Sequence, residues 1–215
     1  MYIEPARTPW DPSGWSLETD LAPALWLKEA SEDAWGRWEN RRPRGVSRVG
    51  DVTTYLYPRY LSISHEAIRR SEDPSGSDPG RYEYLSDGVS SRLVSVLRHQ
   101  TSAANTCWAI HWLGYGDLEP SLLAHPSIQM PARDCILARG SFDWIEEPPV
   151  GERTWGLPPY SPEYWWPTDG AWLVHSDTDL DATYIGCSEA AAEELLALGL
   201  DGLEAVSAET PTIGH

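Results

Sequence analysis

The chain has 215 residues and a mass of 24.0 kDa, with 41% hydrophobic and 23% charged residues, the composition of an ordinary globular protein of one large or two small domains. It contains no glycine period, no heptad repeat and no long apolar stretch, which excludes the collagen, coiled-coil and membrane-spanning classes. The 33 acidic residues outnumber the 16 basic ones and give a net charge of −17, so nucleic acid and membrane surfaces are not expected partners.

The first predicted elements are helical. Asp20 is placed to cap a first helix, and Trp35 and Trp38 lie in a second, shorter one. We therefore divide the chain into a tryptophan-rich N-terminal helical segment, residues 1–47, and a single α+β domain, residues 48–215, on which that segment packs.

The middle of the chain predicts a strand, a loop and a helix in turn. Residues 49–63 alternate β-branched and aromatic side chains and predict a strand, and the turn-forming residues 72–80 predict a loop. Residues 88–100 have the apolar spacing of a helix, with Asp87 as its cap. The face that this helix buries is marked by four side chains, Val89, Leu93, Val96 and Leu97.

The remaining elements are short strands and a closing helix. We predict four strands in one sheet, at 108–112, 134–139, 171–175 and 182–185. Ser188 caps the closing helix, and Gly199 ends it. Helices and strands follow one another without βαβ regularity, and 17 glycines and 18 prolines indicate a loop-rich chain. The predicted fold class is therefore α+β, with a mainly antiparallel sheet flanked by a few helices.

The cysteines and the first residues indicate the compartment. Cys107, Cys135 and Cys187 are far apart and show no CxxC spacing, which predicts free thiols rather than a disulfide framework or a zinc site. The first ten residues lack the basic and apolar regions of a secretory signal. We expect a cytoplasmic protein without a cofactor.

Negative charge is concentrated in the last third of the chain. Residues 141–215 contain 15 acidic residues and one base, Arg153, for a net charge of −14. These acids could be neutralised by arginines from upstream, or they could form an acidic face that binds a basic protein partner. The candidate partner-binding residues are Asp177, Asp179, Asp181, Glu189, Glu193 and Glu194.

Aromatic composition is unusual, with 12 tryptophans and one phenylalanine. Trp165 and Trp166 are adjacent, so in an extended chain they point to opposite sides, and Trp172 follows closely. These three residues could form a stacking platform in a ligand-binding module. The alternative is that indole rings fill an aromatic core and anchor proline-rich loops.

Three segments carry a resemblance to a known family: YLYPRYLSISHEAI, TCWAIHWLGYG and SPEYWWPTDGAWLVHSDTDLDATYIGCSEA. Over residues 48–205 the chain resembles a family of conserved hypothetical proteins of actinobacteria, which has no assigned activity. The chain departs from the family pattern at three positions, Gly170, His65 and Cys187. The end of the third segment also shows a distant similarity to small immunity proteins of the SUKH type, which implies an immunity-like role.

An alternating string of aspartates is the best metal-like pattern. Asp177, Asp179 and Asp181 resemble positions of a calcium loop, but Ala182 replaces the required glycine and Ser188 the closing glutamate. We therefore predict an acidic hairpin turn and no metal site.

Catalytic candidates are few. His175 lies close to Asp177, which could orient it as a general base, and His111 on another strand could meet the pair in space. The chain contains no GxSxG, P-loop, GxGxxG or HExxH motif. We expect a non-enzymatic, acidic protein-binding domain. The alternatives are a small hydrolase or metal-dependent enzyme that uses His175 and Asp177, and the tryptophan-based ligand-binding module.

Overall fold

The computed structural model describes residues 15–41, 46–72, 75, 85–103, 105–114, 120–142 and 162–213. Its helices are a short 3-10 turn, η1 (Ala22–Ala24), and α1 (Leu25–Asn40), α2 (Val49–Thr53), α3 (His65–Glu72), α4 (Asp87–Leu97), α5 (Pro120–Leu123) and α7 (Glu189–Ala197). Its strands are β1 (Trp15–Leu17), β2 (Arg59–Ser64), β3 (Cys107–Trp112), β4 (Ile128–Met130), β5 (Arg133–Gly140), β6 (Tyr164–Pro167), β7 (Leu173–His175), β8 (Ala182–Cys187) and β9 (Leu203–Val206).

All described strands join one antiparallel sheet, in the order β1-β5-β3-β6-β7-β8-β2-β9, with β4 pairing to β5 beside β1. The predicted α+β class is confirmed, and so is the placement of the four predicted strands in one sheet. The sheet includes β1, so the N-terminal segment contributes a strand as well as a helix. The predicted loop at 72–80 lies mostly outside the described residues.

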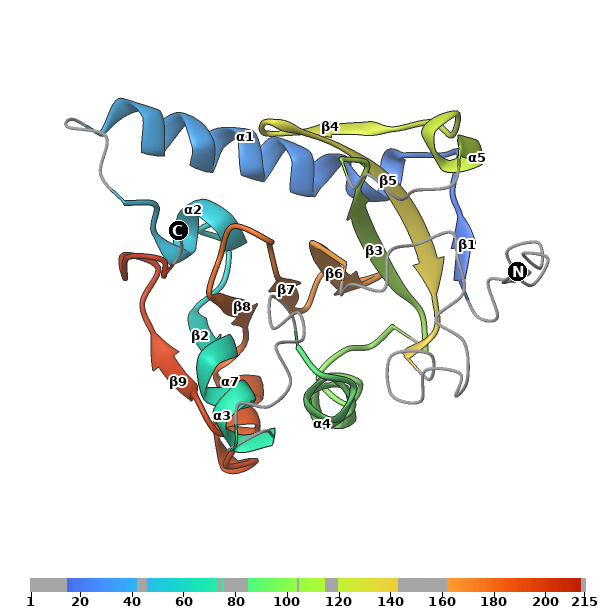
Figure 1. The fold of residues 1–215 in the computed structure, drawn as a ribbon. Helices are drawn as coiled ribbons and strands as arrows, with labels where there is room; N and C mark the ends of the chain where they lie inside the picture. The colour runs from blue at the N-terminus through green and yellow to red at the C-terminus, as the bar shows by residue number, and fades with distance from the viewer. Residues whose placement is uncertain are drawn as a thin grey trace, which may run out of the picture.

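The sheet lies between two groups of helices. Figure 1 shows α1 and α2 on one side of it and α4 and α7 on the other. Because side chains alternate along each strand, neighbouring residues join different cores. On the α1 side, Leu27 packs with Ile110, Leu137 and Trp166. On the α4 side, the core includes Leu93, Leu97, Trp165, Val174, Ile185 and Leu195.

Helix α4 packs through the predicted face. Leu93 and Leu97 are fully buried, Val89 is 7% exposed, and Val96 packs against the same core. The predicted cap is wrong by one residue, because Ser86 takes the extended N-cap conformation and its hydroxyl accepts a hydrogen bond from the Val89 amide. The prediction for α7 is confirmed: Ser188 accepts from the Ala191 amide, and Gly199 follows with a positive φ of 60°.

Two predicted elements are wrong. The segment 49–63 is not one strand, because its first part forms α2 and the strand begins at Arg59. Helix α2 is held by tertiary bonds, in which Val49 and Gly50 donate to carbonyl groups near the C-terminus, and Thr54 ends it with a φ of 66°. The two helices expected near the N-terminus form one helix, α1, and Asp20 caps neither it nor η1, although its carboxylate accepts a hydrogen bond from the Ala22 amide at the start of η1.

Candidate functional site

Antiparallel pairing brings several polar residues to one end of the sheet. Strand β3 ends where β5, β6 and the turn after β7 meet, because Ile110 pairs with Tyr164 and Tyr164 with His175. We call the polar residues at this position the strand-end cluster: Arg133, Glu163, Tyr164, His175 and Asp177. Two of them, His175 and Asp177, were candidates from the sequence.

Arg133 is the centre of the cluster. Its Nη2 donates to Oδ1 of Asp177 and to Oδ2 of Asp179, both at 2.7 Å. Its guanidinium lies 4.5 Å from the ring of Trp112. Burial works to lower the pKa of Arg133, but the two aspartates outweigh it and raise this pKa. The cluster therefore holds a permanent ion pair that is mostly shielded from water, with the Arg133 and Asp177 side chains each 16% exposed.

His175 is fixed inside the protein. It is 3% exposed, its Nδ1 lies 2.7 Å from the carbonyl oxygen of Glu163, and the ring of Tyr164 stacks on it at 4.1 Å. The carboxylate of Glu163 accepts from the Trp112 amide at 2.6 Å. Burial lowers the pKa of His175, although Asp177 favours its charged form. The imidazole is therefore closed off from solvent, between the backbone of Glu163 and the ring of Tyr164.

His111, the third catalytic candidate, does not meet His175 in the structure. His111 alternates with Ile110, which packs on the α1 side, so His111 faces the α4 side. By the same alternation His175 lies on the face of Leu173, which is the α1 side. His111 is 4% exposed, and burial lowers its pKa to about 3.

The three tryptophans proposed as a stacking platform are core residues. Trp165, Trp166 and Trp172 are 2%, 1% and 0% exposed. Trp165 and Trp172 pack edge to face at 5.1 Å, and Trp172 Nε1 donates to the carbonyl of Leu97 at 2.9 Å. Their ring faces are covered by protein, so these residues do not offer a surface on which a ligand can stack.

The aspartate string forms a turn that is organised by an arginine. The carboxylates of Asp177 and Asp179 both bind Arg133, and the Asp179 amide donates back to Asp177 at 2.9 Å. The Asp181 amide donates to the Ile213 carbonyl at 2.9 Å. Among the described residues, no three His, Cys, Asp or Glu side chains converge as a metal site requires.

The six predicted partner-binding residues do not form one face. Asp177, Asp179 and Asp181 precede β8, and Glu189, Glu193 and Glu194 follow it on α7. The six residues of β8, each advancing about 3.3 Å, separate the first set from the start of α7 by roughly 20 Å. The six candidate residues therefore lie in two separate regions.

Upstream arginines neutralise part of the acidic last third. Arg59 binds Glu189 at 3.0 Å, and Arg48 binds Glu209. Other acids are exposed and form no ion pair with a described residue: Glu193, Glu194, Asp201 and Glu204, of which Asp201 accepts a hydrogen bond from the Ser71 hydroxyl. We call these four residues the acidic rim. Arg153, the base of this region, lies outside the described residues.

Sequence reasoning missed Arg133, Glu163 and a buried hydroxyl network. Nε2 of His65 lies 3.0 Å from Oγ1 of Thr183, which lies 2.6 Å from Oγ of Ser176. No motif marks these residues, because they come from segments far apart in the sequence. A weak signal was present at Glu163, an acid placed directly before the aromatic run YWW.

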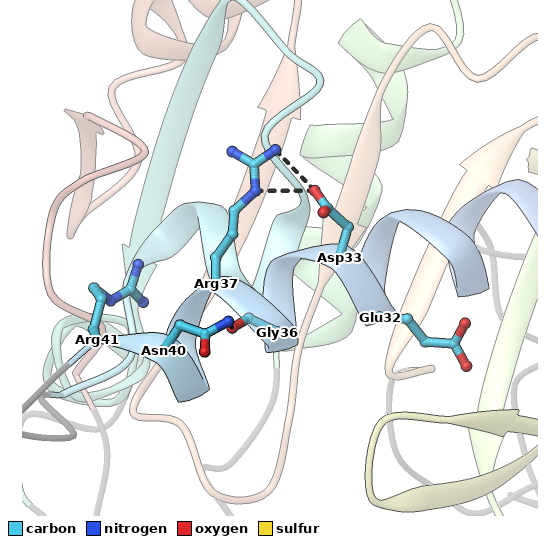
Figure 2. Close-up of a pocket in the computed structure, with 6 residues that line it drawn as sticks. All are labelled: Glu32, Asp33, Gly36, Arg37, Asn40 and Arg41. Carbon is cyan, nitrogen blue, oxygen red and sulfur yellow. Dashed lines mark hydrogen bonds and ion pairs between the residues drawn. The ribbon is translucent and has the colours of Figure 1, made fainter.

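A shallow hollow lies along α1 (Figure 2). Its lining is polar, but the side chains already have partners: Figure 2 shows Arg37 directed at Asp33, with Nε to Oδ2 at 2.9 Å, and Glu32 binds Lys28 outside the hollow. Asn40 donates to the Gly36 carbonyl at 2.8 Å, and Arg41 binds Asp51 outside the hollow. The hollow therefore presents side chains that are already paired rather than free groups for a ligand.

The chain matches no family model, no curated protein and no solved structure at a significant level. The resemblance to the actinobacterial family rests on the three segments named above and stays a prediction. No helix in the described ranges is both long enough and apolar enough to cross a membrane.

Proposed function

We propose that the chain is a non-enzymatic, cytoplasmic protein that binds a basic protein partner through its acidic rim. The proposal rests on one observation: Glu193 and Glu194 are exposed on α7 and form no ion pair with a described residue. The neighbouring Glu189, by contrast, is bound by Arg59. An immunity-like role, expected from the distant similarity to SUKH-type proteins, is one form of such binding.

Burial supports this proposal over the other two functions. A general base must reach its substrate, but His175 is 3% exposed and is covered by Tyr164. A stacking platform must expose its rings, but the three candidate tryptophans are inside the core. The acids of α7 are, in contrast, on the surface. Three buried cysteines without disulfide bonds fit the reducing cytoplasm.

Binding of this kind depends on salt in a specific way. Exposed acids attract a basic partner only over distances comparable to the Debye screening length, which is about 8 Å at physiological ionic strength. Steering by such charges acts mainly on the association rate. Raising the salt concentration to about 0.5 M should therefore slow association more than it speeds dissociation.

The test compares two pairs of charge reversals. Glu193→Lys with Glu194→Lys changes the rim, and Glu29→Lys with Glu39→Lys makes the same change of net charge on α1, on the other side of the sheet. The immobilised chain is exposed to a lysate of its source organism at low salt, and binding of each captured protein is then measured with purified components. We expect a basic partner that the α7 variant binds at least about tenfold more weakly and the α1 variant binds normally. Equal capture by both variants would show that the rim is a solubilising surface.

A further inference from the structure

Strand β9 forms an open edge of the sheet within the described part of the chain. It is the last strand in the sheet order, and β2 is its one described neighbour, as Figure 1 shows. After β9 the chain turns at 207–210 and runs to α2, where the carbonyls of Ala208 and Thr210 accept hydrogen bonds from Gly50 and Val49. The described C-terminal residues thus follow the α2 side of the sheet rather than the outer side of β9.

The register shows which backbone groups of β9 point outward. The Ser64 amide donates to the Gly202 carbonyl at 3.1 Å, so these two residues form a hydrogen-bonded pair. Hydrogen-bonded and non-hydrogen-bonded pairs alternate along an antiparallel ladder. Glu204 is therefore bonded to β2, whereas Leu203 and Ala205 direct their backbone groups away from it.

One of these outward groups is already used. The Leu203 amide donates to the Leu200 carbonyl at 3.2 Å in the turn before the strand. The carbonyl of Leu203 and both backbone groups of Ala205 remain on the outer edge, and Ala205 is exposed. These three groups have the spacing with which an added strand forms hydrogen bonds to a sheet edge.

The charge around this edge identifies the kind of strand that fits it. Asp201 precedes β9, and the side chain of Glu204 lies on the α2 face of the strand, where Val206 packs. Helix α7, with Glu193 and Glu194, packs on the opposite face, where Leu203 packs, so acids lie on both faces of this edge. The nearby helix α3 is neutral overall, because its two arginines, Arg69 and Arg70, are balanced by Glu66, which binds both, and by Glu72. A second copy of β9 would bring acidic residues together, so the chain's own strand is a poor occupant.

We infer that a basic, extended segment of another protein adds to β9 as an extra strand. Its backbone bonds to Leu203 and Ala205, and its Lys or Arg side chains face Glu204 on one face of the sheet or Glu193 and Glu194 on the other. This inference rests on the proposed function, because it specifies how the basic partner binds at the rim. It also requires hydrogen bonds to the backbone of Ala205, whereas a purely electrostatic contact does not.

The first test measures the backbone directly. The full chain is titrated with a capped six-residue peptide of alternating arginine and valine, and exchange of the Ala205 amide is followed by NMR. We expect this amide to exchange at least roughly tenfold more slowly with the peptide bound, because it then donates to the added strand. A peptide of alternating glutamate and valine should give no protection. Absence of protection by the basic peptide, or equal protection by both, overturns the inference.

The second test uses a matched pair of variants. Ala205→Pro removes the outward N–H without removing a bond to β2, whereas Ala205→Val keeps the N–H and favours a strand. We expect the proline variant to bind the basic peptide roughly tenfold more weakly and the valine variant to bind it within about twofold of the original chain. Circular dichroism checks that both variants fold. If the proline variant does not fold, the exchange measurement on the unaltered chain alone decides whether the inference holds.

The outcomes separate this inference from the proposed function. If Ala205→Pro binds as well as Ala205→Val while the Glu193→Lys and Glu194→Lys reversal weakens binding, the rim binds a partner but strand addition is wrong. If the proline variant loses binding while the reversal has no effect, strand addition stands and the electrostatic proposal fails. If sedimentation shows a dimer that Ala205→Pro abolishes, the edge pairs with a second copy, and the inference of a basic partner is overturned.

Discussion

The strand-end cluster and the acidic rim use the same residue types in opposite surroundings. In the cluster, Asp177 is 16% exposed and bonded to Arg133 at 2.7 Å. In the rim, Glu193 and Glu194 are exposed on one helix and form no ion pair with a described residue. Both belong to the last third of the chain, which carries a net charge of −14. The same excess charge is therefore bonded within the fold in one region and exposed to water in the other.

This difference shows what net charge alone leaves undecided. A carboxylate that is bonded to a shielded guanidinium contributes to stability, and its removal leaves a charge without its partner. A carboxylate in water contributes little to stability and affects mainly association with other molecules. Stability measurements and binding measurements should therefore respond to different acids, which the following predictions use.

The largest expected effect is loss of stability in mild acid. Burial lowers the pKa of His65 to about 4 and of His111 to about 3, and it lowers the pKa of His175 as well. The unfolded chain has ordinary histidines with a pKa of about 6.5, so below this pH it binds more protons than the folded chain. The contribution of these histidines to the free energy of unfolding is therefore fully present above about pH 6.5 and is lost as the pH decreases toward 4. Each histidine loses about 1.4 kcal/mol for each pH unit between its unfolded and folded pKa. The sum is several kcal/mol, enough to unfold a marginally stable domain.

Urea unfolding at a series of pH values measures this loss. His111→Gln removes one buried histidine, so its stability should change less steeply between about pH 6.5 and 5, whatever its absolute stability. The rim variants should keep the original slope, because they leave all three buried histidines in place. A flat profile for the unaltered chain in this range contradicts the prediction.

The next effect contrasts two aspartates that bind the same arginine. Asp177→Ala should lower the free energy of unfolding by about 3 kcal/mol, because Arg133 is left shielded from water with one partner fewer. Asp179→Ala should cost less than about 1 kcal/mol, because Asp179 is 79% exposed and its bond to Arg133 is screened by solvent. Urea unfolding at neutral pH gives both values. Equal losses would mean that burial does not distinguish the two.

Sequence patterns predicted the parts of the fold that depend on local order. The spacing of Val89, Leu93 and Leu97 identified the buried face of α4, and Ser188 identified the start of α7. The segment 49–53 resembled a strand because of its β-branched residues, yet it forms α2. Its helix depends on bonds to Ala208 and Thr210, more than 150 residues away, which no local pattern contains.

The site was harder to predict for the same reason. Asp177 and His175 were found because they are close in sequence, whereas Arg133 is 44 positions from Asp177. Glu163 contacts His175 through its backbone, so its side-chain type gave no indication of this role. The relative positions of the acids could not be predicted either. The six candidate acids are close in sequence, but the fold places them in two regions about 20 Å apart.

A smaller effect tests how firmly α7 holds the rim. The Ser188 hydroxyl accepts from the Ala191 amide at 3.1 Å and caps the helix that carries Glu193 and Glu194. Ser188→Ala should cost about 1 kcal/mol, and Ser188→Gly only a few tenths, because glycine is tolerated at a helix N-cap. Urea unfolding compares the two variants. A loss as large for glycine as for alanine would show that Ser188 acts through something other than the cap.

The smallest expected effect is at the rim itself. Glu193→Lys with Glu194→Lys should change the free energy of unfolding by less than about 0.5 kcal/mol, since both side chains are in water. Both residues also lie beyond the first turn of α7, where the helix dipole has little influence on them. Glu189→Lys is the informative neighbour, because it reverses a charge at the first position of the helix and breaks the pair with Arg59, and it should cost about 0.5–1 kcal/mol. If the double reversal instead destabilises the chain as much as Asp177→Ala does, the rim acids hold the fold together, and the distinction between a structural and a binding acidic region fails.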